Sequence, residues 1–151
     1  MFSIEAIMST NLITVPPSAT LAEARTLMHD HRIHHIPVID NGKLTGLLTL
    51  TNVLAATDSF LRDPKNRIHA NEIIVEDAMV SEVATVDLHA GLRQAALFIE
   101  KHKIGCLPVM DNDKLVGIIT DTDFVAVAIN LLEQLEESEP VFEDFDDEAA
   151  D

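Results

Sequence analysis

Hydrophobic and polar positions alternate along this chain in two patterns, and each pattern occurs twice. One pattern has the period of an α-helix, which brings its apolar residues onto a single face. These faces consist of Leu21, Ala24, Leu27, Met28 and His31 in the first half and of Leu92, Ala95, Phe98, Ile99 and His102 in the second. Ser18 and Thr20 are expected to cap the first helix, and Gly91 stands at the start of the second.

The other pattern consists of short apolar runs on both sides of a turn signal. Residues 36–39 and 44–50 flank Asn41-Gly42, and both turn residues tolerate a positive φ, so this segment predicts a β-hairpin. The weaker turn signal Asn112-Asp113 has the same setting. The continuous apolar run 115–119 is typical of a strand that is covered on both faces.

A threonine follows each predicted hairpin and marks the start of another helix. Thr51 and Thr122 are expected to cap helices over residues 52–61 and 123–135. Each half therefore reads as a short turn, a strand, a helix, a hairpin of two strands and a final helix. This order predicts an α+β fold.

The two halves are copies of one another at a constant offset of 71 residues. From Ile4 to Thr57, 19 of 54 positions carry the same residue 71 positions later, without a gap. Two copies are too few for a solenoid, which needs about three stacked units. They fit a pseudo-twofold arrangement with the function at the seam between the halves.

Neither half is expected to fold alone, because a domain of about 55 residues buries only about 60% of its unfolded surface. We expect the two sheets to pack against each other as one module. The predicted divisions are a first repeat over 4–61, a polar connector over 62–74, a second repeat over 75–135 and an acidic disordered tail over 136–151.

Composition narrows the classes of function. The formal net charge of −16 argues against binding the nucleic-acid backbone. Ten of the 26 acidic residues lie between Glu133 and Asp151. A solvating tail is preferred there over a tail whose Val141, Phe142 and Phe145 dock on a partner or on a basic patch.

No apolar run approaches the roughly 20 residues of a membrane span and no leader is recognisable. These two features predict a cytoplasmic protein without a membrane partner. The single cysteine excludes an internal disulfide and is compatible with a reducing compartment.

Several short motifs occur in the same order in both halves. They are the leading segments Glu5-Ala6-Ile7-Met8 and Glu76-Asp77-Ala78-Met79, the strands Ile33-His34-His35-Ile36-Pro37-Val38 and Ile104-Gly105-Cys106-Leu107-Pro108-Val109, and the segments that begin at Gly46 and Gly117. Together they resemble a tandem pair of cystathionine-beta-synthase (CBS) domains, a Bateman module. The resemblance covers residues 4 to about 132, and the freestanding pair is similar to small bacterial regulatory proteins of the acetoin-utilisation type.

This resemblance implies a site for an adenosine compound such as AMP, ADP, ATP, S-adenosylmethionine or NAD. In such pairs a Gly-x-x-Thr-x-x-Asp segment holds the ribose, and here Gly117, Thr120, Thr122 and Asp123 supply it. A carboxylate in the first turn of a helix can accept two vicinal hydroxyls, and the open amides of the helix start can hold phosphate. Thr120, Thr122 and Asp123 are equally suited to capping the helix, and the two roles are compatible.

The resemblance also implies which residues contact the adenine base and the phosphate of the ligand. The strand with Ile104, Cys106, Leu107 and Pro108 is expected to contact adenine, and His34 and His35 are expected to reach the phosphate. The first repeat has Asn52 in place of the aspartate, and an amide adds donors where acceptors are needed. We therefore expect a weaker second site, formed by Thr49, Asn52, Ile36 and Pro37.

The histidines and the cysteine are interpreted as non-catalytic. His29, His31, His34 and His35 lack a converging spacing and an accompanying metal motif, so ordinary histidines are preferred over a metal site. His31 and His102 are expected to close their helices near the core face. Cys106 has no evident base beside it in the sequence and is expected to be a buried, inert thiol.

Three functions are compared. The preferred one is a regulatory module that binds an adenosine-type small molecule, requires no cofactor, forms a homodimer and signals to a partner protein not identified by the sequence. The alternative is a ligand-free interaction or dimerisation scaffold, which Asn52 and the non-basic Gly105-Cys106 favour. An enzyme is disfavoured because no nucleophile, base and oxyanion donor can be assembled.

Overall fold

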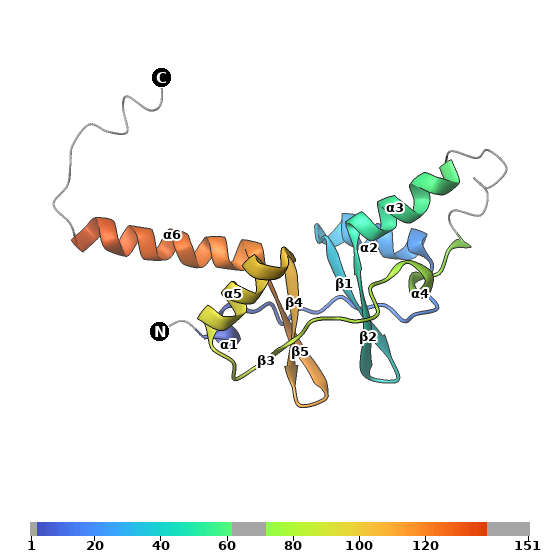
Figure 1. Ribbon diagram of the computed structural model, residues 1–151. Coiled ribbons are helices and arrows are strands. Elements are labelled where there is room, and N and C mark those ends of the chain that lie inside the picture. The colour runs from blue at the N-terminus through green and yellow to red at the C-terminus, as the bar shows by residue number, and fades with distance from the viewer. Residues whose placement is uncertain (1–2, 62–71, 139–151) are drawn as a thin grey trace, which may run out of the picture.

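A computed structural model describes residues 3–61 and 72–138 of the chain. In the first half the elements are α1 (Ile4–Ile7), α2 (Leu21–His31), β1 (His35–Asp40), β2 (Lys43–Thr49) and α3 (Leu50–Leu61). In the second half they are α4 (Val75–Ala78), β3 (Val86–Asp87), α5 (Leu92–His102), β4 (Cys106–Asp111), β5 (Lys114–Thr120) and α6 (Asp121–Ser138). The two antiparallel hairpins stand side by side, with β2 against β5, and α3 and α6 run outward in opposite directions (Figure 1). The α+β fold of two similar repeats is confirmed.

The local sequence signals account for most of these elements. Thr20 begins α2 with a capping box, in which its hydroxyl accepts from the Glu23 amide and the Glu23 carboxylate accepts from the Thr20 amide. Asn41 and Gly42 have φ values of 52° and 79°, as a tight hairpin turn requires. The strand expected before α2 is reduced to a single parallel bridge between Val15 and Val38.

The last helix of each repeat begins two residues earlier than predicted. The expected caps, Thr51 and Thr122, lie within the first turns of α3 and α6. Thr49 and Thr120, which end β2 and β5, precede the helices instead. The Thr49 hydroxyl accepts from the Asn52 amide, whereas Thr120 donates from its amide and its hydroxyl to the Asp123 carboxylate. The strand passes directly into the helix, so a sequence pattern that needs a turn between them misplaces the boundary. Helix α6 continues to Ser138, three residues into the segment assigned to the acidic tail; residues 139–151 and 62–71 lie outside the described part.

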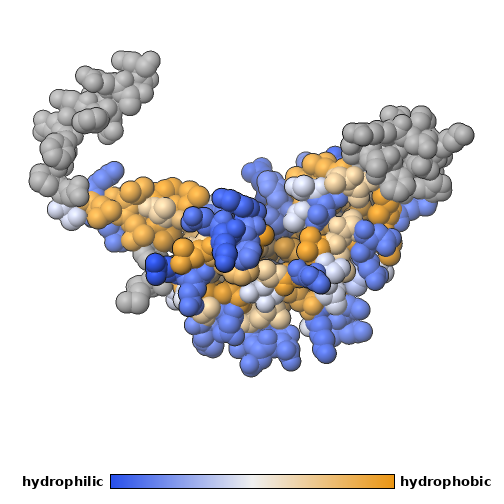
Figure 2. Space-filling view, in the orientation of Figure 1, coloured by the Kyte–Doolittle hydropathy of each residue, from blue (hydrophilic) through white to orange (hydrophobic). Residues whose placement is uncertain are grey.

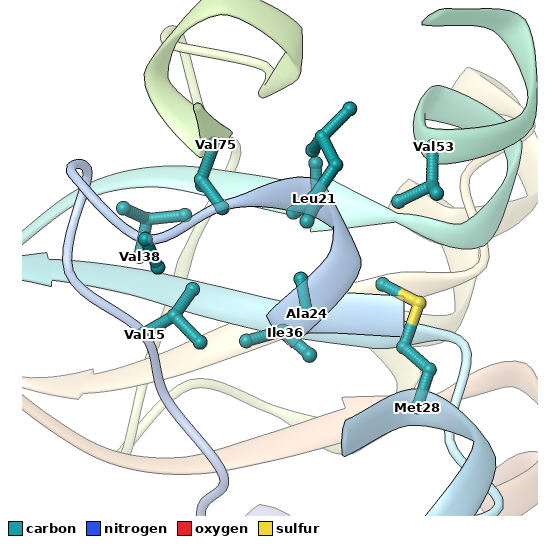
Figure 3. Close-up of a cluster of buried hydrophobic side chains, with 10 residues drawn as sticks. Val15, Leu21, Ala24, Met28, Ile36, Val38, Val53 and Val75 are labelled. Carbon is teal, nitrogen blue, oxygen red and sulfur yellow. The ribbon is translucent and has the colours of Figure 1, made fainter. Parts of the chain in front are cut away.

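The leading helix of each repeat, α1 or α4, packs in the hydrophobic core of the other repeat. Ile4 of α1 packs with Leu107, Val109 and Ile119 of the second repeat, and Val75 of α4 packs with the core of the first. Figure 3 shows Val75 pointing from α4 toward Leu21 and Val38. Backbone hydrogen bonds fix the exchange, from the Val75 amide to the Ala19 carbonyl at 2.7 Å and from the Leu21 amide to the Ile73 carbonyl at 2.8 Å.

The chain that follows each leading helix then pairs with a strand of the opposite hairpin. Ser9 bridges Ile118 of β5, and Val80 bridges Leu47 of β2. At these crossings Gly117 faces the sulfur of Met8, and Gly46 faces the sulfur of Met79, with no room for a Cβ. The methionines and glycines of the repeated motifs are therefore packing partners across the two repeats. Among the described residues, no helix is long and apolar enough to cross a membrane.

Candidate functional site

Two clefts lie between the repeats, and the pseudo-twofold relates them. The first cleft, about 370 Å³, is lined by Ser9, Asn11, Leu12, Ile13, Arg32, Ile33, His34, His35, Pro37, Ile118, Thr120, Asp121, Thr122 and Asp123. The second cleft, about 390 Å³, is lined by Leu47, Thr49, Thr51, Asn52, Val80, Glu82, Val83, Ala84, Lys103, Ile104, Gly105 and Cys106, and also by His35. Both volumes lie in the range of small-molecule sites.

Each cleft is built from parts of both repeats. In the first cleft, the start of α6 and the end of β5 face the segment before α2 and the residues that lead into β1. The crossing described above causes this pairing, because residues 9–13 lie against β5 of the other repeat. A further backbone bond joins the Asp121 amide to the Gly105 carbonyl at 3.1 Å, which holds the start of α6 beside β4.

This pairing separates residues that the sequence analysis placed in one site. Thr120, Thr122 and Asp123 do share a cleft with His34 and His35, but Ile104 and Cys106 line the second cleft instead. Pro37, expected in the weaker site, lines the first cleft, whereas Thr49 and Asn52 line the second. Both changes have one cause: the helix start of one repeat faces the strand of the other.

Four of the expected site residues line neither cleft. Ile36, Leu107 and Pro108 are fully buried side chains in the core. Gly117 is buried under Met8, with the Ser9 carbonyl 3.1 Å from where a Cβ would stand. Their positions in the strands are explained by packing, since these strands are covered on both faces.

One side-chain oxygen of Asp123, at the start of α6, is hydrogen-bonded within the protein, and the other is available to a ligand. The Oδ2 atom of Asp123 accepts from the Thr120 amide at 2.8 Å and from the Thr120 hydroxyl at 3.3 Å. Among the described residues, no protein group donates a hydrogen bond to Oδ1. A half-buried carboxylate held in this way by Thr120 is fixed in orientation and can still accept hydroxyl donors from a ligand.

In the second cleft the equivalent residue is Asn52, which caps its helix but carries no negative charge. The Asn52 Oδ1 accepts from the Thr49 amide at 3.0 Å, and the Thr49 hydroxyl accepts from the Asn52 amide at 3.0 Å. The amide oxygen is used by the cap, so the NH₂ group is what Asn52 can offer to a ligand. Glu82 also lines this cleft where the first has Asn11 at the offset of 71.

Charge is distributed unevenly across the first cleft. Asp121 and Asp123 stand at the helix start, and Asp121 already accepts from the Thr122 amide at 2.9 Å. The two acids and this occupied amide make the start of α6 a poor phosphate site, contrary to the expectation drawn from its open amides. Arg32 and His34 also line this cleft, together with the apolar residues Leu12, Ile13, Ile33, Pro37 and Ile118.

His35 lines both clefts and is the one expected site residue that does so. Burial lowers its pKa below the ordinary value of 6.5, the Asp121 carboxylate opposes that effect, and His34 adds to it. At neutral pH the ring is therefore uncharged and offers one donor and one acceptor. This makes Arg32 and exposed His34 the more suitable phosphate partners.

The remaining histidines and the cysteine are located as follows. His31 and His102 end α2 and α5 as expected, but both are exposed rather than on the core face, and His102 stacks on Phe98 with 4.2 Å between ring centroids. Cys106 is buried, as expected. Burial, with Asp121 and Asp123 adding to it, raises the pKa of its thiol to about 12, so it is not a thiolate nucleophile at neutral pH. Within residues 3–61 and 72–138, no three His, Cys, Asp or Glu side chains are grouped to hold a metal ion.

The repeat relates the missed lining residues of the two clefts to one another, once one cleft is known. Ser9, Asn11, Leu12, Ile13 and Arg32 correspond at the offset of 71 to Val80, Glu82, Val83, Ala84 and Lys103 of the second cleft. The alignment indicates that the two sites are equivalent, but it does not reveal which helix start faces which strand.

Known structures share this architecture. A crystal structure described as a candidate acetoin utilization protein (AcuB) from Vibrio cholerae is similar with a TM-score of 0.76 and 43% identity, covering 93% of this chain and 99% of that one. CBSX2 in complex with AMP is similar with a TM-score of 0.73 and 27% identity, covering 87% and 98%. The CBS domain pair of protein MJ0100, in complex with 5-methylthioadenosine and S-adenosyl-L-methionine, has a TM-score of 0.73 and 25% identity, covering 86% and 98%.

Curated relatives agree with the structures. The CBS domain-containing protein YhcV from Bacillus subtilis is 32% identical over 119 residues, which cover 79% of this chain and 80% of that protein. A matching enzyme, homoserine O-acetyltransferase from Methanocorpusculum labreanum, shares only 22% of its own length with this chain. The model of the CBS domain matches residues 4–59 and 75–130. This chain therefore belongs to the CBS domain family and consists of a tandem pair of CBS domains.

Proposed function

We propose that this protein is a non-enzymatic regulatory module that binds an adenosine-containing ligand in the first cleft. The observation that carries the proposal is the position of Asp123, whose carboxylate is held by Thr120 and keeps one oxygen available inside a cleft of about 370 Å³. Two vicinal ribose hydroxyls are the donors that such an acceptor fits. The complexes of CBSX2 with AMP and of MJ0100 with S-adenosyl-L-methionine support an adenosine compound.

The orientation of the ligand follows from the walls of the cleft. The ribose lies at Asp123, and the base lies among Leu12, Ile13 and Ile118, where apolar contacts are available. A phosphate points away from Asp121 and Asp123 and toward Arg32 and His34. The second cleft has Asn52 and Glu82 at the corresponding positions and binds more weakly.

A thermal-shift panel with AMP, ADP, ATP, NAD and S-adenosylmethionine tests the proposal. A ligand present at 100 times its dissociation constant stabilises the folded state by about 2.7 kcal/mol, which is readily measured. A rise in melting temperature with one or more of these compounds supports the module. No rise with any of them at millimolar concentration contradicts it and leaves the scaffold as the better account.

The scaffold alternative is favoured by an apolar surface on the last helix. Val125, Ile129, Leu132 and Leu135 of α6 are each more than half exposed, and Figure 2 shows hydrophobic residues along this helix. Such a surface supports a homodimer with isologous contacts, as we also propose for the ligand-binding module. Sedimentation of the native protein and of Ile129→Glu tests it: the native protein should be a dimer and the variant a monomer. A native monomer at micromolar concentration contradicts dimerisation.

A further inference from the structure

A groove rich in basic side chains adjoins the first cleft. It has a volume of about 350 Å³ and is lined by Arg25, Met28, His29, Arg32, Ile33, His34 and Leu50. Three of these residues, Arg32, Ile33 and His34, also line the first cleft, so the groove adjoins the cleft along these residues. No acidic side chain lines the groove, although the formal net charge of the protein is −16.

The basic residues are not neutralised by neighbouring acids. Among the described residues, neither Arg25 nor Arg32 has an ion pair, and His29 has only exposed Asp30 beside it, with 3.4 Å between Nδ1 and Oδ1. Favourable interactions with the helix dipole are confined to the last turn. They could account for His29 and Arg32 at the end of α2, but Arg25 lies nearly two turns earlier.

The second repeat provides an internal comparison. At the offset of 71, Ala96, Glu100, Lys103 and Gly105 stand where the first repeat has Arg25, His29, Arg32 and His34. Since both helices end in the same left-handed conformation, at Arg32 and Lys103, the requirements of the fold do not explain the extra basic residues. They occur only beside the cleft that holds the Asp123 carboxylate.

We propose that this groove is a subsite for the outer phosphates of the ligand, so that the ligand is an adenosine polyphosphate rather than a monophosphate or a cationic adenosine compound. The inference rests on the proposed function, since the nucleoside is held in the first cleft. The phosphate chain leaves the cleft at Arg32 and His34 and continues between Arg25 and His29. Guanidinium groups suit this role because they donate two parallel hydrogen bonds to phosphate oxygens.

Isothermal titration with AMP and ATP, without added divalent cations, tests the subsite in the native protein, in Arg25→Gln and in Arg93→Gln. Arg93 lies on α5, is exposed and lines neither the groove nor the clefts described above, so its variant removes the same charge elsewhere. We expect the native protein to bind ATP at least about tenfold more tightly than AMP, the equivalent of one charge-assisted hydrogen bond. Arg25→Gln should remove most of this difference and leave AMP binding unchanged, while Arg93→Gln should change neither.

Equal affinities for AMP and ATP in the native protein, or equal losses for both in Arg25→Gln, overturn the inference and leave the proposed function standing. The same holds if Arg93→Gln weakens ATP as much as Arg25→Gln does, because a general charge effect then suffices. Inorganic tripolyphosphate that binds more tightly than ATP overturns the nucleotide assignment in favour of free polyphosphate. No binding of AMP, ATP or S-adenosylmethionine refutes the proposed function and the inference together.

Discussion

Replacing Asp123 by asparagine separates the two roles of this residue, the helix cap and the ligand contact. The cap needs one oxygen, which accepts from the Thr120 amide at 2.8 Å. The first repeat already shows that asparagine can do this, because Asn52 accepts from the Thr49 amide at 3.0 Å. Asp123→Asn should therefore fold normally and lose only the favourable charge at the start of α6, about 0.3–1 kcal/mol of stability.

The effect on binding should be much larger. With its oxygen used by the cap, the asparagine turns its NH₂ group toward the cleft, where the ribose hydroxyls need acceptors. Each hydrogen bond to a charged acceptor contributes roughly 1.5–3 kcal/mol. Loss of two such bonds costs about 3 kcal/mol or more, so the dissociation constant for the adenosine ligand should rise at least about a hundredfold.

Isothermal titration measures the affinity, and thermal unfolding without ligand measures the stability. Asp121→Asn is the matched control, since Asp121 lines the same cleft and carries the same charge, but its Oδ1 is engaged by the Thr122 amide. Its affinity should change by much less. An unchanged affinity in Asp123→Asn would remove this residue from the site. A large loss of stability in the same variant would show that the Asn52 precedent does not transfer.

Three further changes test the rest of the reasoning. Asn52→Asp should give the second cleft a carboxylate acceptor and raise the stoichiometry of adenosine binding from one toward two per chain; a stoichiometry that stays at one would mean that Asn52 is not what weakens this cleft. Gly117→Ala should destabilise the protein by about 1–3 kcal/mol in chemical unfolding, because its Cβ meets both Met8 and the Ser9 backbone, and it should cost more than Gly46→Ala, whose nearest neighbours are atoms of the flexible Met79 side chain. Equal costs would disprove the role assigned to the Ser9 backbone. Burial holds the pKa of His35 below 6.5 in the folded state, so as the pH falls His35 is protonated in the unfolded chain before it is protonated in the folded one. The contribution of His35 to stability should therefore be complete above pH 6.5 and decline as the pH falls toward the folded-state pKa. The difference in unfolding free energy between His35→Gln and the native protein should change over this range. A difference that stays constant with pH would contradict the assignment to His35.

The sequence by itself determined the repeat, the secondary structure and the family. Those features depend on local signals: helical periodicity around Ala24 and Ala95, the Asn41-Gly42 turn, and motifs that recur at one offset. The Thr120–Asp123 pair could also be predicted, because its members are three residues apart and interact within one turn of chain. Even here the helix start was misplaced by two residues, since nothing local distinguishes Thr120 from Thr122 as the residue that precedes the helix.

Only the tertiary structure decided which residues share a cleft. Two similar repeats can be joined with each helix start facing its own strand or the other repeat's strand, and the local pattern is the same in both cases. The structure has the second arrangement, because the leading helices are exchanged and Ser9 and Val80 pair with the opposite hairpins. Long-range packing of Met8 on Gly117 and of Val75 in the first core therefore places Asp123 in one cleft with Arg32 and His34, and Cys106 in the other cleft with Asn52.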